Sequence, residues 1–247
     1  MTDNTPAAVV AALNDRPELP AGDDERFVGF GVMGLPFASG HYLGLRQFPT
    51  ATFAPAYASV WHRDPAGRWT FYATTPGEQS CARYFSSSTA NDAVQCDIDI
   101  RWDAPWSVTI AIPGLLDWTV TLGETRATRL MTSVAQRMPE RAWTDPRALA
   151  AMSRVAGRVL GVGEMRLAGT ASNGQTFTVA PRTVWTVTGT RAVLNGTDLG
   201  DSAPLAIQAR LGDFRLPQRG IAAIADGHFE TFDPGRHRAS MRTVTLA

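Results

Sequence analysis

The sequence predicts a mainly β protein, an antiparallel barrel or sandwich with a pair of helices inserted in the middle of the chain. Three observations lead to this class. Residues 94–122 alternate apolar and polar side chains with the two-residue period of half-buried strands. Turn residues recur at the short spacing that is typical of antiparallel sheets. Residues 124–161 change instead to the spacing of amphipathic helices.

Length and composition indicate a globular protein with no preference for nucleic acid. The chain has 247 residues, of which 44% are hydrophobic and 19% are charged. Its 23 basic residues equal its 23 acidic residues, so it lacks the basic surplus that phosphate contacts require, and we expect no nucleic-acid partner. Every basic residue is an arginine. The absence of lysine excludes a lysine Schiff base and a P-loop lysine.

No segment resembles a targeting or membrane-spanning element. No apolar run approaches the length that crosses a bilayer, and the first 20 residues lack the basic region and apolar core of a signal peptide. We therefore expect a cytoplasmic protein with no membrane span. In that compartment Cys81 and Cys96 are expected as free thiols, although a cross-strand disulfide between them is geometrically conceivable.

Changes of pattern divide the chain into four segments. Residues 1–26 are rich in Asp, Pro and Ala and form an N-terminal arm, in which we expect a helical turn or two at residues 6–13 and loose attachment of the rest. Residues 27–123 form a first antiparallel β half, residues 124–161 the helical pair, and residues 162–247 a second antiparallel β half. The two β halves make either two small barrels or one larger sheet system.

The first β half opens with a glycine-rich stretch at residues 27–40. The spacing of Gly29, Gly31 and Gly34 superficially matches the dinucleotide fingerprint. That fingerprint needs a helix directly afterwards, and the residues that follow do not begin one. We therefore expect a glycine-rich entry loop.

Short runs bounded by turn residues predict the strands on either side of the helices. In the first half they are residues 40–48, 56–63, 68–73, 94–102, 106–112 and 116–122, with residues 81–85 as a further strand candidate before a serine-rich loop. In the second half they are residues 164–170, 176–180, 183–188, 191–195, 205–210, 219–224, 228–232 and 242–246.

Two helices are expected between the β halves. The first lies within residues 124–138, and the second starts at Thr144-Asp145-Pro146 and stops at Gly161. Each carries one apolar stripe, so the pair should pack together and cover an open end or face of the sheet. The flexible side chains of four methionines are expected as gap-fillers under this cover: Met131, Met138, Met152 and Met165.

Three strand motifs in the first half resemble a known family. They are G-H-Y-L-G-L-R-Q-F at residues 40–48, Y-A-S-V-W-H-R at residues 57–63 and R-W-T-F-Y-A at residues 68–73, the last two joined by a D-P-x-G turn. Together they resemble the opening of the lipocalin-like family that includes the carotenoid hydratases (hydroxyneurosporene synthase). The resemblance implies lipocalin-like (calycin-like) barrels and, for some members, the addition of water to an isoprenoid double bond. The resemblance does not identify a catalytic residue in this sequence.

The polar face of the central strands supplies the candidate acids Asp97, Asp99 and Asp117. On an antiparallel sheet such a face usually meets solvent, and this is the favoured interpretation. If one of these carboxyl groups points instead into an apolar cavity, desolvation would raise its pKa and let it act as a general acid. Aromatic and basic side chains are the candidate ligand contacts: Tyr57, Trp61, Trp102, Trp106, Trp118 and Arg215.

Histidines are the other candidate catalytic residues. His41 and His62 lie on adjacent predicted strands and are expected to approach each other, whereas His237 lies in a charged run expected to be solvated. No histidine pair has the spacing of a metal site, so we expect no metal and no cofactor.

Residues 211–220 form a polar, irregular turn that contains Arg215. Its arginines and Asp213 predict either a structural ion-pair corner or a site that binds a carboxylate through an arginine fork. The ion-pair corner is favoured because such networks are common in structures.

These patterns and the family resemblance predict a protein that encloses an apolar or amphipathic small molecule, isoprenoid or lipid-like, in a β-barrel cavity. Metal-free, acid-catalysed hydration, cyclisation or isomerisation is the chemistry that the acids would support. The alternatives are a non-catalytic lipocalin-like carrier or sensor and a structural module whose β core is dry.

Overall fold

The structure is a computed structural model that describes residues 4–85, 89 and 93–235. Its helices are α1 (Pro6–Asp15), α2 (Ala82–Phe85), α3 (Arg126–Arg137) and α4 (Pro146–Leu160). Its strands are β1 (Glu25–Pro36), β2 (Tyr42–Ala51), β3 (Tyr57–Arg63), β4 (Trp69–Ala73), β5 (Val94–Gln95), β6 (Asp99–Ala104), β7 (Ser107–Ile112), β8 (Leu116–Gly123), β9 (Ala168–Thr170), β10 (Thr176–Leu194), β11 (Thr197–Asp198), β12 (Arg210–Leu211), β13 (Phe214–Arg215) and β14 (Ile221–Phe229).

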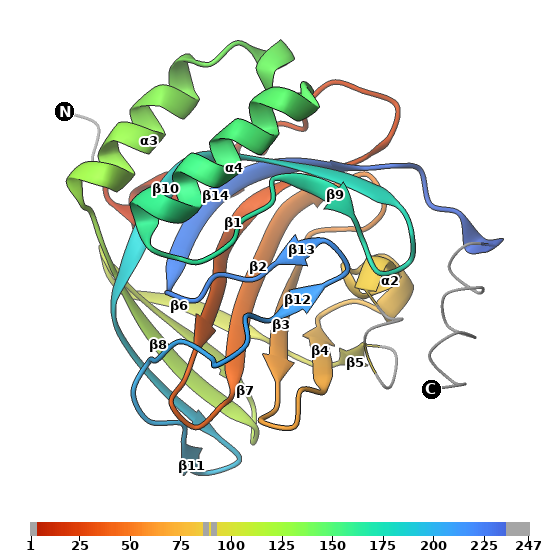
Figure 1. Cartoon of the computed structure of the whole chain (residues 1–247). Coiled ribbons are helices and arrows are strands. Elements are labelled where there is room, and N and C mark those ends of the chain that lie inside the picture. Colours follow the sequence, from red (N-terminus) through yellow and green to blue (C-terminus); the bar gives the residue numbers. More distant parts are fainter. Residues whose placement is uncertain (1–3, 86–88, 90–92, 236–247) are drawn as a thin grey trace.

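One strongly curled sheet dominates the molecule, so the predicted mainly β, barrel-like class is confirmed (Figure 1). Its strand order is β5-β4-β3-β2-β1-β14-β10-β8-β7-β6, and β9 and β11 pair with β10 outside this path. All its strand pairs are antiparallel except β4 with β5. Strand β14 lies between β1 and β10. Both β halves therefore belong to one larger sheet system rather than to two small barrels.

Strand β1 occupies the stretch predicted as a glycine-rich loop, and that prediction is wrong. The glycines are needed because β2 approaches β1 closely. A Cβ atom added at Gly29 would overlap the carbonyl oxygen of Gln47, and one at Gly31 would lie 2.6 Å from the carbonyl oxygen of Leu45. The β1–β2 register also shifts along the pair. Glycine here permits a sharply bent strand, a use that sequence spacing alone does not distinguish from a loop.

Several predicted strands differ in extent from those observed. Strand β10 runs for 19 residues and merges three predicted strands. Pro181 does not end the strand because it lies at a register shift in the pairing with β14. Residues 81–85 contain the helix α2 rather than a strand. Residues 94–102 divide between β5 and β6, which pair with different partners. The strand predicted at residues 242–246 and the charged run around residue 237 lie outside the described residues.

The two faces of the sheet carry separate cores. Leu43 and Leu45 of β2 point into an aliphatic cluster, and the alternate residues Tyr42 and Phe48 point into an aromatic one. Helix α1 packs on the aliphatic cluster through Val10, which is 1% exposed. The helix expected near residues 6–13 is therefore present and docked on the sheet, whereas residues 11–24 include no fully buried side chain. Helix α2 and the β12–β13 hairpin contribute residues to the aromatic cluster.

Helices α3 and α4 confirm the predicted helical pair and lie over the β10 and β14 side of the sheet (Figure 1). Thr125 caps α3, and the Asp145 carboxylate accepts a hydrogen bond from the backbone N–H of Arg147 at 2.8 Å to cap α4. Helix α4 ends at Gly161, which adopts a left-handed conformation with φ of 64°. Within the described part of the chain, every helix is too short or too polar to cross a membrane.

Candidate ligand-binding pocket

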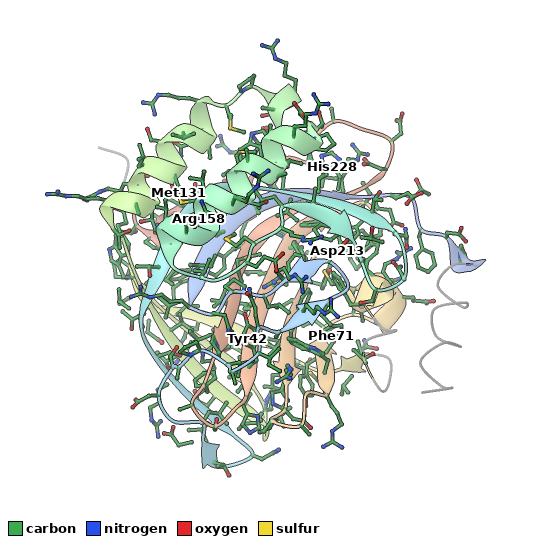
Figure 2. All side chains as sticks on the ribbon, viewed as in Figure 1. Tyr42, Phe71, Met131, Arg158, Asp213 and His228 are labelled. Carbon is green, nitrogen blue, oxygen red and sulfur yellow. The ribbon has the colours of Figure 1, made fainter. Side chains whose placement is uncertain are left out.

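An apolar pocket lies between the helical pair and the sheet. Its volume is about 370 Å³, which is within the range of small-molecule sites. Figure 2 labels Met131 of α3 and Arg158 of α4, the two helices that lie over this part of the sheet. Five of the chain's seven methionines line the pocket: Met33, Met131, Met138, Met152 and Met165. The four that were expected as gap-fillers do lie under the helices, but they line an open space rather than fill it.

The mouth of the pocket is apolar and open to solvent. Four large aliphatic side chains of the helices are between 51% and 64% exposed and also line the pocket: Leu130, Val134, Val155 and Val159. Exposed apolar patches of this kind on a soluble protein mark binding sites. A ligand can therefore enter between the two helices without meeting a charged side chain of the lining.

Helix α4 packs on the chain that follows it. Leu167 N–H donates to Ser153 Oγ at 2.9 Å, and Val162 N–H donates to the carbonyl of Gly157 at 3.1 Å. These bonds hold the buried side of α4 against residues 162–167. The side that bears Met152 and Val155 is left facing the space above the sheet.

A smaller inner cavity of about 40 Å³ adjoins the pocket. Four residues line both spaces: Met33, Val179, Ala223 and Ala225. Aromatic rings dominate the rest of its wall: Phe27, Phe30, Phe48, Trp61, Phe85, Phe214 and Phe229. The ionisable side chains in its lining are those of Arg46 and Cys81.

Arg46 projects from β2 into this cavity and is 5% exposed. Its guanidinium donates from Nη1 to the carbonyls of Val32 and Leu45, both at 2.8 Å, and from Nη2 to the carbonyl of Met33 at 3.2 Å. It also stacks 4.4 Å from the ring centre of Trp61. The three hydrogen bonds occupy at most three of the five N–H groups of an arginine. No described carboxylate forms an ion pair with it.

The groups around Arg46 do not neutralise its charge. Burial lowers the pKa of Arg46 to about 10, so it stays protonated at neutral pH. Burial raises the pKa of Cys81 to about 11 and raises the pKa values of Tyr42 and Tyr57 well above 10. These three groups are therefore uncharged at neutral pH, and the inner cavity carries a net positive charge.

Two neighbouring polar groups are also left without a partner among the described residues. Ser59 is directly opposite Arg46 in the β2–β3 register, and its hydroxyl is buried and makes no hydrogen bond. The indole N–H of Trp61, which lines the cavity, is likewise buried and unpaired. Buried polar groups without a hydrogen-bond partner are costly, so an acceptor placed in the cavity beside Trp61 would lower this cost.

The candidate acids lie away from this pocket. Asp97, Asp99 and Asp117 are all exposed and line neither part of it. These three carboxyl groups therefore face solvent, as the favoured interpretation of the polar face expected. The structure brings none of them to the apolar space that was expected to raise a carboxyl pKa.

The candidate aromatic contacts divide between the two cores. Trp61 lines the inner cavity, and Tyr57 lies beside it, where its hydroxyl is 3.1 Å from the sulfur of Cys81. Trp118 is fully buried in the aliphatic cluster, and its indole N–H donates to Thr190 Oγ1 at 3.0 Å. Trp102 and Trp106 also pack on that cluster. These last three rings therefore belong to the core on the other face.

His41 and His62 meet, as expected. Nδ1 of His41 lies 2.9 Å from Nε2 of His62, and the rings are stacked with centres 5.1 Å apart. Burial lowers the pKa of both, that of His62 to about 4. Neither lines the pocket. In the described part of the chain, no three His, Cys, Asp or Glu side chains are grouped to hold a metal ion.

Arg215 belongs to an ion-pair network, in agreement with the favoured interpretation of its segment. Its Nε lies 3.2 Å from Glu164, and the same carboxylate group lies 3.4 Å from Arg166, which also pairs with Asp213 at 2.9 Å. Both cysteines, Cys81 and Cys96, are free thiols.

Sequence reasoning missed Arg46, the most unusual residue of the site. A signal was available in the strand Y-L-G-L-R-Q-F, where Arg46 shares a face with Tyr42, Gly44 and Phe48. A charged residue at a core-facing position of a strand breaks the binary pattern and often marks a functional site. The pocket itself could not be predicted from the sequence, because it depends on the distance between α4 and the sheet.

Comparison with known proteins finds distant structural similarity that carries no argument about fold. No protein-family model and no curated protein matches the chain. The acetoacetate decarboxylase of Legionella pneumophila subsp. pneumophila str. Philadelphia 1 is 10% identical, with a TM-score of 0.40 over 87% of this chain and 89% of that chain. A second acetoacetate decarboxylase structure is 10% identical, with a TM-score of 0.39 over 86% and 88% of the two chains. Similarity at this level carries no argument about function.

Proposed function

We propose that this protein binds an apolar small molecule in the pocket between α3, α4 and the sheet. The observation that carries the proposal is the large apolar pocket, whose mouth is formed by exposed aliphatic side chains and whose walls hold five methionines. Methionine side chains adapt to irregular ligands because they are unbranched and polarisable. The ligand class agrees with the lipid-like or isoprenoid molecule expected from the sequence, but the site lies under the helical pair.

The lining supports binding better than it supports acid-catalysed chemistry. Hydration, cyclisation or isomerisation of an alkene without a metal needs a protonated acid at the ligand. Among the described residues that line either cavity there is no Asp or Glu, and Cys81 is a weak acid whose pKa is raised. A lysine Schiff base is excluded because the chain contains no lysine. A carrier or sensor of an apolar molecule is therefore the form of the proposal that the site supports best.

Native mass spectrometry of the purified full chain, followed by organic extraction, tests this function. We expect a stoichiometric apolar molecule to co-purify, or the protein to take up decanoate or decanol when either is supplied. A protein that stays ligand-free and binds neither compound would contradict the proposal.

Two neighbouring alanines on α4 give a matched pair of variants. Ala151 lines the pocket and Ala150 does not, and both side chains are exposed, so a substitution at either should leave the fold intact. We expect Ala151→Trp to narrow the pocket and weaken decanol binding by roughly tenfold, the cost of a few lost methylene contacts. Ala150→Trp should bind decanol as the unmodified protein does. Equal affinities for the two variants would place the ligand elsewhere.

A further inference from the structure

We infer that the ligand is an amphipathic anion, a monocarboxylate with an apolar tail, and that Arg46 binds its carboxylate in the inner cavity. This inference rests on the proposed function and specifies its ligand class. The tail occupies the pocket under the helices, and the head passes Met33 to reach the guanidinium. Met33 lines both spaces, so they adjoin at this side chain, whose flexible thioether can move aside to let one ligand occupy both.

The charge balance of the inner cavity is the first argument. A guanidinium that is 5% exposed and has no described carboxylate partner is expensive to bury, because the protein interior solvates a charge poorly. Stacking on Trp61 and three backbone carbonyls offset part of this cost. An anion supplied from outside would complete the pair, and carboxylates fit the planar arginine fork.

Unused hydrogen-bond donors are the second argument. Arg46 retains at least two N–H groups that make no hydrogen bond to a described residue. The hydroxyl of Ser59 and the indole N–H of Trp61 are buried and unpaired on the same face of β2 and β3. Arg46 and Trp61, which line the cavity, can only donate, and the serine hydroxyl beside them can also donate, so an acceptor on the ligand would satisfy these groups.

The size of the inner cavity selects a small head group. Its volume of about 40 Å³ corresponds to about three water-sized groups. The carbon and two oxygens of a carboxylate match that number, whereas a sugar or a nucleotide does not. Gly31 also lines the cavity, and a Cβ atom there would lie 3.5 Å from Nη1 of Arg46.

The test compares two ligands that share a tail and differ in the head, decanoate and decanol, by calorimetric titration of the full chain. We expect the unmodified protein to bind decanoate at least about tenfold more tightly than decanol, since hydrogen bonds to charged groups are worth this factor or more. Arg46→Met should remove the difference and retain decanol binding. The comparison of ligands on the unmodified protein decides the question even if this variant does not fold.

A surface arginine provides the control for net charge. Arg191 of β10 has a side chain that is 73% exposed, and it lines neither cavity. Arg191→Met removes the same charge, and we expect it to keep the preference for decanoate. Equal affinity of the unmodified protein for decanoate and decanol would overturn the inference and leave the proposed function standing. Failure to bind either ligand would overturn both.

Discussion

At the scale of single residues, the two faces of the same strands bury different kinds of side chain. Leu43 and Leu45 of β2 pack in a buried apolar core, whereas Arg46 holds a charge on the other face, among aromatic rings. A protein selected for stability alone would replace a buried, unpaired cation by an apolar residue of similar size. The presence of Arg46 in an otherwise apolar cavity is therefore the strongest residue-level sign of function.

The histidine pair makes a prediction about pH. The pKa of His62 is lower in the folded protein, about 4, than its ordinary value of 6.5, because burial disfavours the charged ring. As the pH falls below about 6.5 the unfolded chain therefore binds the proton first, and folding loses stability until the pH reaches about 4. The loss should be on the order of 2–3 kcal/mol at the lower end.

Urea unfolding at a series of pH values, for the unmodified protein and for His62→Gln, measures this effect. We expect the variant to lose less stability between neutral pH and the lower limit, because glutamine does not titrate. If both proteins lose the same amount, His62 does not carry the pH dependence.

At the scale of elements, the helical pair has separate anchoring and binding sides. Helix α4 is anchored near its start by Leu149, which is 1% exposed and packs with Trp143 and Leu167. Val155, one turn and a half further along, is 60% exposed at the mouth of the pocket. The same helix therefore stabilises the fold through one set of side chains and forms the pocket with another.

Alanine substitutions separate these two roles. We expect Leu149→Ala to lower the free energy of unfolding by about 2–4 kcal/mol, because it leaves a cavity in a packed cluster. Val155→Ala should change it by less than about 0.5 kcal/mol and weaken decanol binding by a few-fold. Urea unfolding and titration of both variants check this expectation. A large stability loss in Val155→Ala would show that the mouth of the pocket is closed in solution.

At the scale of the whole molecule, the sequence predicted what depends on local pattern. The mainly β class, the helical pair and the alternation of β7 and β8 follow from periodicity, which each segment carries by itself. The position of β14 between β1 and β10 could not be predicted, because the pairing of strands that are distant in the sequence produces no local sequence pattern. The bent strand β1 was mistaken for a loop, since a glycine needed for close approach looks like a glycine in a turn.

The site was predictable only in part, for the same reason. Trp61 was chosen because large aromatic residues suit ligand contact, and it does line the inner cavity. Asp97 and Trp118 were chosen from a regular strand pattern, but sequence alternation does not tell which apolar face encloses a cavity and which is filled. The pocket arises from the separation of α4 from the sheet, which is a property of tertiary packing.

The most direct test of the pocket is a nuclear magnetic resonance titration with decanoate, using methyl-labelled methionine. Five of the seven methionines line the pocket, so the label reports ligand binding at five positions of its wall. We predict that the methyl signals of Met33, Met131, Met138, Met152 and Met165 shift together and saturate at one ligand per chain. Binding that leaves these five signals unchanged would contradict a ligand site between the helical pair and the sheet.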